Sequence, residues 1–359
     1  MSIGVLSSAM IEALVTTGAI KAVDDILPEQ VQPASLDLRL GDTAYRVRAS
    51  FLAGQGKPVD WRLADFEMHR VDLSGGAVLE KGCVYVVPLM ERLHLPADIS
   101  AVANAKSSTG RLDLLTRTIT DGGTEFDRIP PGYEGPLYAE ICPRSFSVLV
   151  RPGMRLNQIR FRRGSAALDD AALSDLHRRT PLVDGTPHIG DGLGFSVDLN
   201  PRQGTLVGYR AKPHAGIIDL GKIDHYAPED YWEEVHAKNG RIILDPGAFY
   251  ILVSREAVTI PPTHSAEMAP YLAMVGEFRV HYAGFFDPGF GWTEAGGAGS
   301  RGVLEVRCHE APFVLEHGQI VGRLVYEAMA EVPERLYGAD IHSNYQGQGL
   351  KLSKHFRTA

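Results

Sequence analysis

The chain has 359 residues, of which 44% are hydrophobic and 22% charged, so it can bury one large core or two medium ones. Its formal net charge of -8 offers no basic field for a nucleic-acid backbone, although a few local cations can still bind a small anion. The three cysteines are scattered along the chain, which favours a reducing cytoplasm and no disulfide framework. The first segment is unlike a signal peptide, and no apolar run reaches the length that a membrane span needs, so neither feature is expected.

The first predicted element is a short amphipathic helix over residues 7–18, with Ser7 or Ser8 as its N-cap and Gly18 as its stop. Short runs of β-type residues follow, separated by glycines and prolines that are spread along the whole chain. The expected strands cover residues 35–41, 83–89, 135–141, 145–150, 195–199, 248–254 and 302–308. The sequence therefore predicts a mainly β fold with a few short helices.

Residues 165–180 change to a composition rich in Ala, Asp and Ser, which is typical of a solvated helix or a linker. We therefore predict a first domain over residues 1–165, a linker over 166–185 and a second domain over 186–359.

The two predicted domains share residues at a constant spacing, as expected of a duplicated unit. The matches that lie 165 positions apart are residues 80–85 with 245–250, Glu140 with Glu305, and Gly153 with Gly318. The strand at 35–38 fits the second half only with an offset of 161, and the Pro-Gly-aromatic turn at 131–133 returns with an offset of 157. The sequence thus predicts two tandem repeats with loops of different length.

Residues 105–111 form a polar segment, Ala-Lys-Ser-Ser-Thr-Gly-Arg, which contains a pair of serine hydroxyls followed by a threonine, together with a lysine and an arginine. Hydroxyls and backbone amides donate to phosphate oxygens, and an arginine offers a planar fork that matches phosphate or carboxylate. The segment is a candidate triphosphate cradle. A polar turn at the end of a strand is the alternative that its composition alone favours.

A second candidate segment runs from His281 through Asp287-Pro288-Gly289 to Glu305. Asp-Pro-Gly predicts a turn that joins two strands. Glu305 lies in an alternating strand pattern, so its side chain faces either solvent or a cleft. For an isolated glutamate on a strand, solvent is the expected side.

The third candidate is the C-terminal segment 343–354, which combines glycines with tyrosine, glutamine and lysine. Glycines let the backbone approach a ligand, and the other side chains can contact a base or phosphates. A frayed tail is the alternative.

Together these motifs resemble the dCTP deaminase branch of the dUTPase-like superfamily. The segments that carry the resemblance, in the family's order, are residues 32–41, 106–111, 281–305, 317–324 and 345–348. The resemblance implies two tandem dUTPase-like β-barrel or jelly-roll-type domains, a long form of the family. It also implies hydrolytic deamination of dCTP to dUTP and ammonia in pyrimidine deoxynucleotide (dUTP and dTTP) biosynthesis.

The resemblance assigns the proton shuttle to Glu305, the positioning of water to Ser107 and the backbone of Ala283, and the orientation of the glutamate or substrate to Arg111. The expected substrate contacts are Lys106, Ser108, His281, Asp287, Gln319, Tyr345, Gln346, Gln348, Lys351 and Lys354. Mg²⁺ is expected only as the companion of the triphosphate. No zinc is expected, because the H-x-E and P-C-x-x-C pattern of zinc deaminases does not occur.

Ordinary members of this family are single-repeat chains that form trimers with sites between subunits, whereas these two repeats keep complementary motifs. The first repeat keeps Ser-Ser-x-x-Arg but has residues 118–123 in place of the His281 segment. The second keeps His281 to Glu305 but has neither a hydroxyl pair nor an arginine over 270–276. We therefore expect the repeats to form one composite site, in which Glu140 is dispensable.

Three alternatives stay open. The family fold also carries dUTP diphosphatases and bifunctional enzymes, although the Arg and Gly-Phe-Gly-rich arm of diphosphatases is absent here. A non-catalytic nucleotide sensor is the third. The expected partner is a small nucleotide, dCTP or a modified cytosine nucleotide, with neither nucleic acid nor membrane, and the chain is a possible homo-oligomer.

Overall fold

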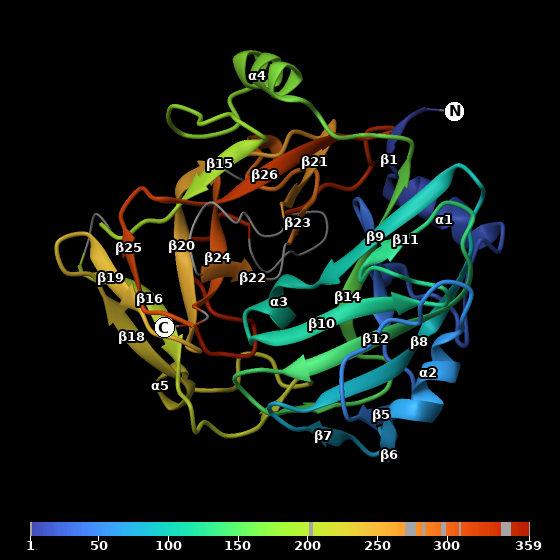
Figure 1. Cartoon of the computed structure of the whole chain (residues 1–359). Coiled ribbons are helices and arrows are strands. Elements are labelled where there is room, and N and C mark those ends of the chain that lie inside the picture. Colours follow the sequence, from blue (N-terminus) through green and yellow to red (C-terminus); the bar gives the residue numbers. More distant parts are fainter. Residues whose placement is uncertain are drawn as a thin grey trace. The chain divides into compact units, whose positions relative to one another are not determined.

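We describe the protein from a computed structural model, which describes residues 2–200, 204–269, 278–281, 284–295, 299–308, 310–338 and 346–358 (Figure 1). Contacts divide the chain into two compact units. Unit 1 contains Met1–Ala166 and Gly216–His225, and unit 2 contains Ala167–Ala215 and Tyr226–Ala359.

The first sheet of unit 1 has the order β11-β9-β14-β4-β3, with β1 paired to β14. Its strands are β1 (Gly4–Val5), β3 (Val31–Gln32), β4 (Ser35–Arg39), β9 (Ile99–Ala105), β11 (Arg128–Ile129) and β14 (Arg155–Arg163). Strand β4 is buried along its whole length, so its polar side chains need partners inside the protein.

The second sheet of unit 1 has the order β10-β12-β8-β5-β6, with β2 paired to β8, and a third small sheet has the order β17-β13-β7. The strands are β2 (Ile20–Ala22), β5 (Thr43–Val47), β6 (Glu67–Asp72), β7 (Ala77–Leu79), β8 (Val84–His94), β10 (Leu114–Thr120), β12 (Glu134–Pro143), β13 (Val148–Val150) and β17 (Ile218–Asp219). Arg151 holds β17 through two hydrogen bonds to Asp219, of 2.7 and 3.1 Å.

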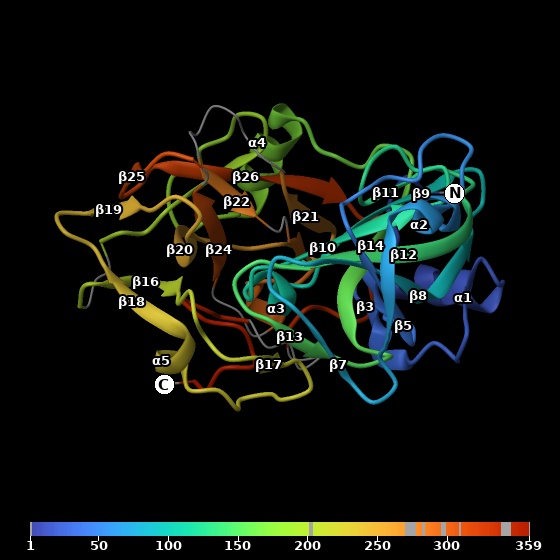
Figure 2. The ribbon, with the colours of Figure 1, turned by 60° about the horizontal axis from the view of Figure 1, so that its bottom comes forward.

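Unit 2 repeats this plan with sheets of order β15-β26-β21-β23, β18-β16-β20-β24-β22 and β19-β25 (Figure 2). Its strands are β15 (Leu193–Ser196), β16 (Leu206–Ala211), β18 (Trp232–His236), β19 (Arg241–Leu244), β20 (Phe249–Val258), β21 (His264–Met268), β22 (Phe278–His281), β23 (Phe285–Phe286), β24 (Ser300–Cys308), β25 (Phe313–Glu316) and β26 (Ile320–Ala328). The prediction of a mainly β fold with two tandem repeats is confirmed.

The strand register carries the predicted 165-residue offset. In unit 1, Glu140 on β12 lies opposite Val86 on β8. In unit 2, Glu305 on β24 lies opposite Ile251 on β20, and both residues are 165 positions later. Equivalent strands therefore place equivalent residues at the same cross-strand positions.

The offset of 161 for the strand at 35–38 is wrong. Leu36 pairs with Ile159, and Leu193 pairs with Leu324, which lies 165 positions after Ile159. Leu193 therefore takes the place of Leu36, with an offset of 157. The sequence match followed a local Ser-x-Asp-Leu similarity, but the pairing with β26 decides the register.

The helices are few and short: α1 (Ser8–Thr16), α2 (Val59–Phe66), α3 (Ser107–Gly110), α4 (Asp170–Arg179), α5 (Pro228–Tyr231) and the 3-10 turns η1 (Pro28–Gln30) and η3 (Thr293–Ala295). Ser7 caps α1 by accepting a hydrogen bond from the Met10 amide at 3.2 Å. Gly18 follows with a φ of 76°, a left-handed conformation that glycine tolerates best. The prediction of this helix is confirmed.

Helix α4 lies within the residues predicted as a linker, but it is part of unit 2. Its buried residues Leu173 and Leu176 join the core of that unit. Asp169 caps the helix through a 2.8 Å bond from the Ala172 amide. The polar composition that suggested a linker belongs to the outward face of a packed amphipathic helix.

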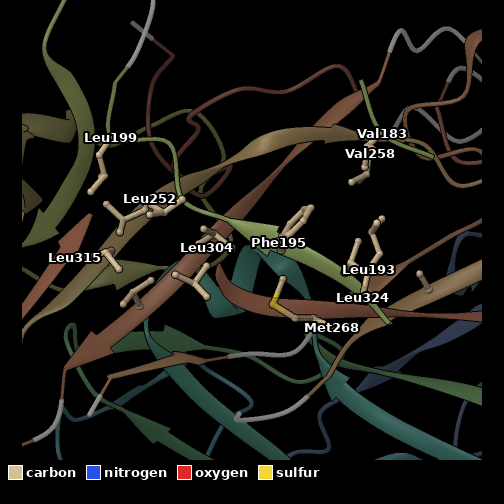
Figure 3. Close-up of a cluster of buried hydrophobic side chains, with 14 of the residues drawn as sticks. Val183, Leu193, Phe195, Leu199, Leu252, Val258, Met268, Leu304, Leu315 and Leu324 are labelled. Carbon is tan, nitrogen blue, oxygen red and sulfur yellow. The ribbon is translucent and has the colours of Figure 1, made fainter. Parts of the chain in front are cut away.

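The core of unit 2 packs side chains from β15, β20, β24 and β26 together (Figure 3). Phe195 is fully buried, and a Cβ on Gly302 would lie 2.2 Å from its ring. Gly302 therefore lets the aromatic ring lie against β24. This packing fixes the strand that carries Glu305.

Candidate active site

The Ser-Ser-x-x-Arg segment forms the single-turn helix α3 directly after β9. The carbonyl of Lys106 accepts hydrogen bonds from the amides of Thr109 and Gly110 at 2.8 and 3.0 Å. Ser107 is half-buried, while Ser108 and Arg111 are 8% and 3% exposed. The turn thus presents the predicted hydroxyl groups and the arginine within one compact segment of unit 1.

Lys106, at the N-terminal end of this turn, forms an ion pair with Asp37 on β4. The Asp37 side chain is only 2% exposed, whereas that of Lys106 is 24% exposed. The side chain of Lys106, a predicted phosphate contact, is therefore partly accessible from solvent.

Glu305 lies in the middle of β24 and is 7% exposed. The expectation of a solvent-facing side chain for an isolated strand glutamate is therefore wrong. Strand β22 lies on one side of it, with His281 as its cross-strand partner, and β20 lies on the other. The register brings the backbones of two predicted site residues, His281 and Glu305, side by side in unit 2.

The Asp287-Pro288-Gly289 segment forms a turn after β23, and Asp287 is 8% exposed. Gly289 has a φ of 97°, and a Cβ there would lie 2.9 Å from the backbone of Tyr337, so glycine is required. Gln346 spans the turn: its Nε2 donates to the Gly289 carbonyl at 3.1 Å, and its Oε1 accepts from the Gly291 amide at 3.0 Å. The predicted Asp287 and Gln346 therefore lie at one turn.

The described part of the C-terminal segment packs onto unit 2, contrary to the frayed-tail alternative. Gln348 donates to the Arg301 carbonyl at 3.2 Å, next to the start of β24. Phe356 packs against Trp232 with ring centroids 5.8 Å apart. Lys351 and Lys354, between these anchors, are half-buried.

The remaining predicted contacts are placed elsewhere or lie outside the described residues. Gln319 lies in the turn between β25 and β26, where its Oε1 accepts a 3.3 Å hydrogen bond from the Glu316 amide. Ala283 and Tyr345 lie outside the described residues, as does the side chain of His281. The composite site stays a prediction, because the two motif sets lie in different units.

In unit 1, Glu140 occupies the position that Glu305 has in unit 2, but its cross-strand partner is Arg117 rather than a histidine. Arg117 Nε donates to Glu140 Oε1 at 3.1 Å, and the Glu140 side chain is 1% exposed. The guanidinium also lies 3.6 Å from the ring centroid of Phe126. A carboxylate held in this way is neutralised by a fixed cation, which suits a structural role.

Asp127 lies beside this ion pair and accepts a 2.7 Å hydrogen bond from the Thr118 amide. Loss of hydration raises the pKa of Asp127 to about 7, the Thr118 amide and Arg117 oppose this rise, and Glu140 adds to it. Asp in an unfolded chain has a pKa of about 3.9. Between these two values the folded protein binds more protons than the unfolded one, so its free energy of unfolding falls as the pH rises.

We expect Asp127→Asn to remove this dependence, because an amide does not titrate. The variant should gain stability relative to the wild type between pH 5 and pH 8, by roughly 1–3 kcal/mol. Urea unfolding at both pH values measures the gain, with Asp98→Asn as the surface control. A stability difference that is equal at both pH values would contradict the shifted pKa.

The described residues include no group of three or more His, Cys, Asp and Glu side chains arranged to hold a metal ion. In the same residues, no helix is long and apolar enough to cross a membrane. None of the three cysteines, all of which lie among the described residues, forms a disulfide.

Two family models cover almost the whole chain. The model described as 2'-deoxycytidine 5'-triphosphate deaminase (DCD) N-terminal domain matches residues 2–165, and that of the C-terminal domain matches residues 169–356. The chain belongs to the dCTP deaminase family. The predicted membership of this enzyme family is therefore confirmed, and each of the two repeats matches one domain of the family.

A solved structure described as 2'-deoxycytidine 5'-triphosphate deaminase from Agrobacterium tumefaciens is 57% identical, with a TM-score of 0.88, and the match covers 92% of this chain and 100% of that one. "dCTP deaminase, dUMP-forming" of Coprothermobacter proteolyticus is 30% identical over 44% of this chain and 81% of its own length. "dCTP deaminase" of Natronomonas pharaonis is 32% identical over 44% of this chain and 79% of its own length. The structural similarity thus extends over both repeats, while each of these two relatives matches less than half of the chain.

Sequence reasoning missed Arg155, which begins β14 and lies 3.9 Å from the Asp37 carboxylate. Its counterpart in the second repeat is Ile320, 165 positions later. Comparing charged residues between the two repeats would have shown this difference.

Proposed function

We propose that the protein hydrolytically deaminates dCTP to dUTP and ammonia in a reducing cytoplasm, as a step of dUTP and dTTP biosynthesis. The observation that carries the proposal is the match of both family domains to a chain whose repeats keep different motifs, residues 107–111 in one and Glu305 in the other. The similarity to a solved deaminase over 92% of the chain supports the same reaction.

The chemistry needs a water aimed at C4 of cytosine, a base that takes its proton, and an acid that protonates the ring and the leaving ammonia. Glu305 serves as both base and acid in turn, because one carboxylate can accept the proton of water and return it. Its low exposure favours proton transfer over exchange with bulk water. Ser107 positions the water, and Arg111 orients the glutamate or the substrate.

We propose that this reaction proceeds without zinc, and that Mg²⁺ arrives with the triphosphate as part of the substrate. Mg²⁺ keeps much of its hydration shell and binds nucleotides through phosphate oxygens. Lys106 and Ser108 on α3 are the proposed phosphate contacts in unit 1, and Lys351 and Lys354 are those in unit 2.

A second candidate is a bifunctional enzyme that also cleaves the triphosphate to give dUMP. Several relatives, among them that of Coprothermobacter proteolyticus at 30% identity, are named as dUMP-forming, which favours this candidate. The match that covers both repeats carries the name of a plain deaminase, so we give the single reaction priority.

Purified protein with Mg²⁺ and either dCTP or dUTP as substrate tests the proposal when nucleotide products, ammonia and pyrophosphate are followed together. We expect dUTP and ammonia in equal amounts. The appearance of dUMP with pyrophosphate would show the bifunctional reaction, and cleavage of dUTP alone would show a diphosphatase. Nucleotide binding without turnover would overturn the proposal in favour of a sensor, and size-exclusion chromatography with light scattering would test the predicted homo-oligomer.

A further inference from the structure

A row of polar side chains crosses three strands of the first sheet in unit 1. Gln158 on β14 lies opposite Asp37 on β4 and opposite Asn104 on β9. Gln158 Nε2 donates to Asn104 Oδ1 at 2.9 Å. Directly opposed residues project to the same face of a sheet, so the row lies on one face.

Two cations flank the carboxylate in this row. Lys106 is ion-paired to Asp37 Oδ2, and Arg155 Nη1 lies 3.9 Å from the same oxygen. The Arg155 side chain is 33% exposed, and its Nη1 donates to the Glu29 carbonyl at 3.3 Å. Within the part of the chain that the structure describes, no hydrogen bond uses Nε or Nη2 of Arg155. Most of its guanidinium fork therefore stays available to an anion.

Asp37 itself is incompletely satisfied. Its Oδ1 atom is buried and has no hydrogen-bond partner among the described residues, while the residue is 1% exposed. A buried carboxylate that lacks part of its hydrogen bonding costs folding free energy. Because Asp37 lowers the stability of the fold, we infer that its role is to hold the two cations in position for a ligand.

The second repeat serves as an internal comparison for this argument. The positions of Asp37 and Gln158 are taken by Gly194 and Arg323, which pair in the same register. The position of Arg155 is taken by Ile320. Because unit 2 builds the same strands without these charges, the fold does not require them. They occur in the repeat that carries the Ser-Ser-x-x-Arg turn.

We propose that Arg155 and Lys106, held on either side of Asp37, bind the terminal phosphate of the nucleotide and set the preference for a triphosphate. The inference rests on the proposed function and adds Arg155 to it as a specificity-determining residue. Arg155 supplies a planar fork and Lys106 a mobile point charge, and together they exceed the single charge of Asp37. A nucleotide that lacks the terminal phosphate makes neither contact.

Steady-state kinetics of the full-length wild type, Arg155→Gln and Arg163→Gln with dCTP, dCDP and dCMP test this inference. Arg163 lies on the same strand and pairs with Asp98 at 2.7 Å, so it is the matched control. We expect Arg155→Gln to raise KM for dCTP about tenfold, which is the usual value of one charged hydrogen bond. The kcat for dCTP and the KM for dCMP should stay at wild-type values, and Arg163→Gln should match the wild type throughout.

An equal rise of KM for all three nucleotides, or an unchanged KM for dCTP, would overturn the assignment. Arg155→Lys, which keeps the charge without the fork, should fall between the wild type and Arg155→Gln. If the wild type turns over no cytosine nucleotide, the proposed function fails. Calorimetric titration with inorganic triphosphate then still tests whether Arg155 and Lys106 bind phosphate. Binding about tenfold weaker in Arg155→Gln supports the pair, and equal binding contradicts it.

Discussion

Replacing Glu305 with glutamine is expected to lower kcat for dCTP by about a thousandfold or more, because an amide cannot take and return the proton of water. Glutamine has nearly the same shape, and Glu305 is only 7% exposed, so the variant should keep the fold. Ammonia release under saturating dCTP measures the loss, and the thermal midpoint checks the fold. A variant that keeps more than a tenth of the wild-type kcat would exclude Glu305 as the proton shuttle.

Arg111 belongs to the other repeat, and Arg111→Ala is expected to lower kcat by about a hundredfold or more through loss of orientation and charge. Arg111 is 3% exposed, so the truncation also removes packing. Arg111→Lys keeps more of the volume and the charge, and it should still be strongly impaired because lysine lacks the planar fork. Full activity in Arg111→Lys would leave only a structural role for this position.

The matched control is Glu140→Gln, which changes the equivalent carboxylate of the first repeat. Arg117 holds Glu140 from the cross-strand position that His281 has in the second repeat. We expect this variant to keep most of the activity, with a lower thermal midpoint because the contact between Arg117 and the buried Glu140 side chain is weakened. Loss of activity equal to that of Glu305→Gln would contradict the assignment of the catalytic role to Glu305 and of a structural role to Glu140.

The second large effect is expected on stability, at the buried ion pair of Arg39 and Glu91. Their side chains are 5% and 0% exposed and meet at 2.8 Å. Glu91 also accepts hydrogen bonds from the Arg39 amide at 2.8 Å and from Gln30 at 2.9 Å. Glu91→Ala leaves a buried guanidinium without its carboxylate, and we expect a loss of about 3–5 kcal/mol in the free energy of unfolding.

Urea unfolding measures this loss, with Glu67→Ala as the control. Glu67 forms a similar pair with Arg70 at 2.9 Å, but the side chains are 24% and 65% exposed. Water screens that pair, so the control should unfold at the same urea concentration as the wild type. Equal destabilisation by both substitutions would show that burial does not govern the strength of these pairs.

Several features of the protein follow from the sequence by itself. Runs of β-type residues between turn residues predict the mainly β fold, and the constant offset between Glu140 and Glu305 predicts the duplication. Ser7 and Gly18 delimit the first helix, because capping and left-handed conformations depend on local residue type. The motif segments identify the family because they occur along the chain in the same order as in the family.

Only the tertiary structure decided the features that depend on cross-strand partners. The expected offset of 161 became 157 because β15 takes its register from β26, a strand that is distant in sequence and that no local signal connects to β15. The burial of Glu305 depends on β20 and β22 on either side of it. The pairing of Asp37 with Lys106 and its approach to Arg155 join residues 69 and 118 positions apart, and no spacing rule along one strand connects them. Local chemistry thus determines the elements, whereas charge pairing and burial depend on contacts between strands that are distant in sequence.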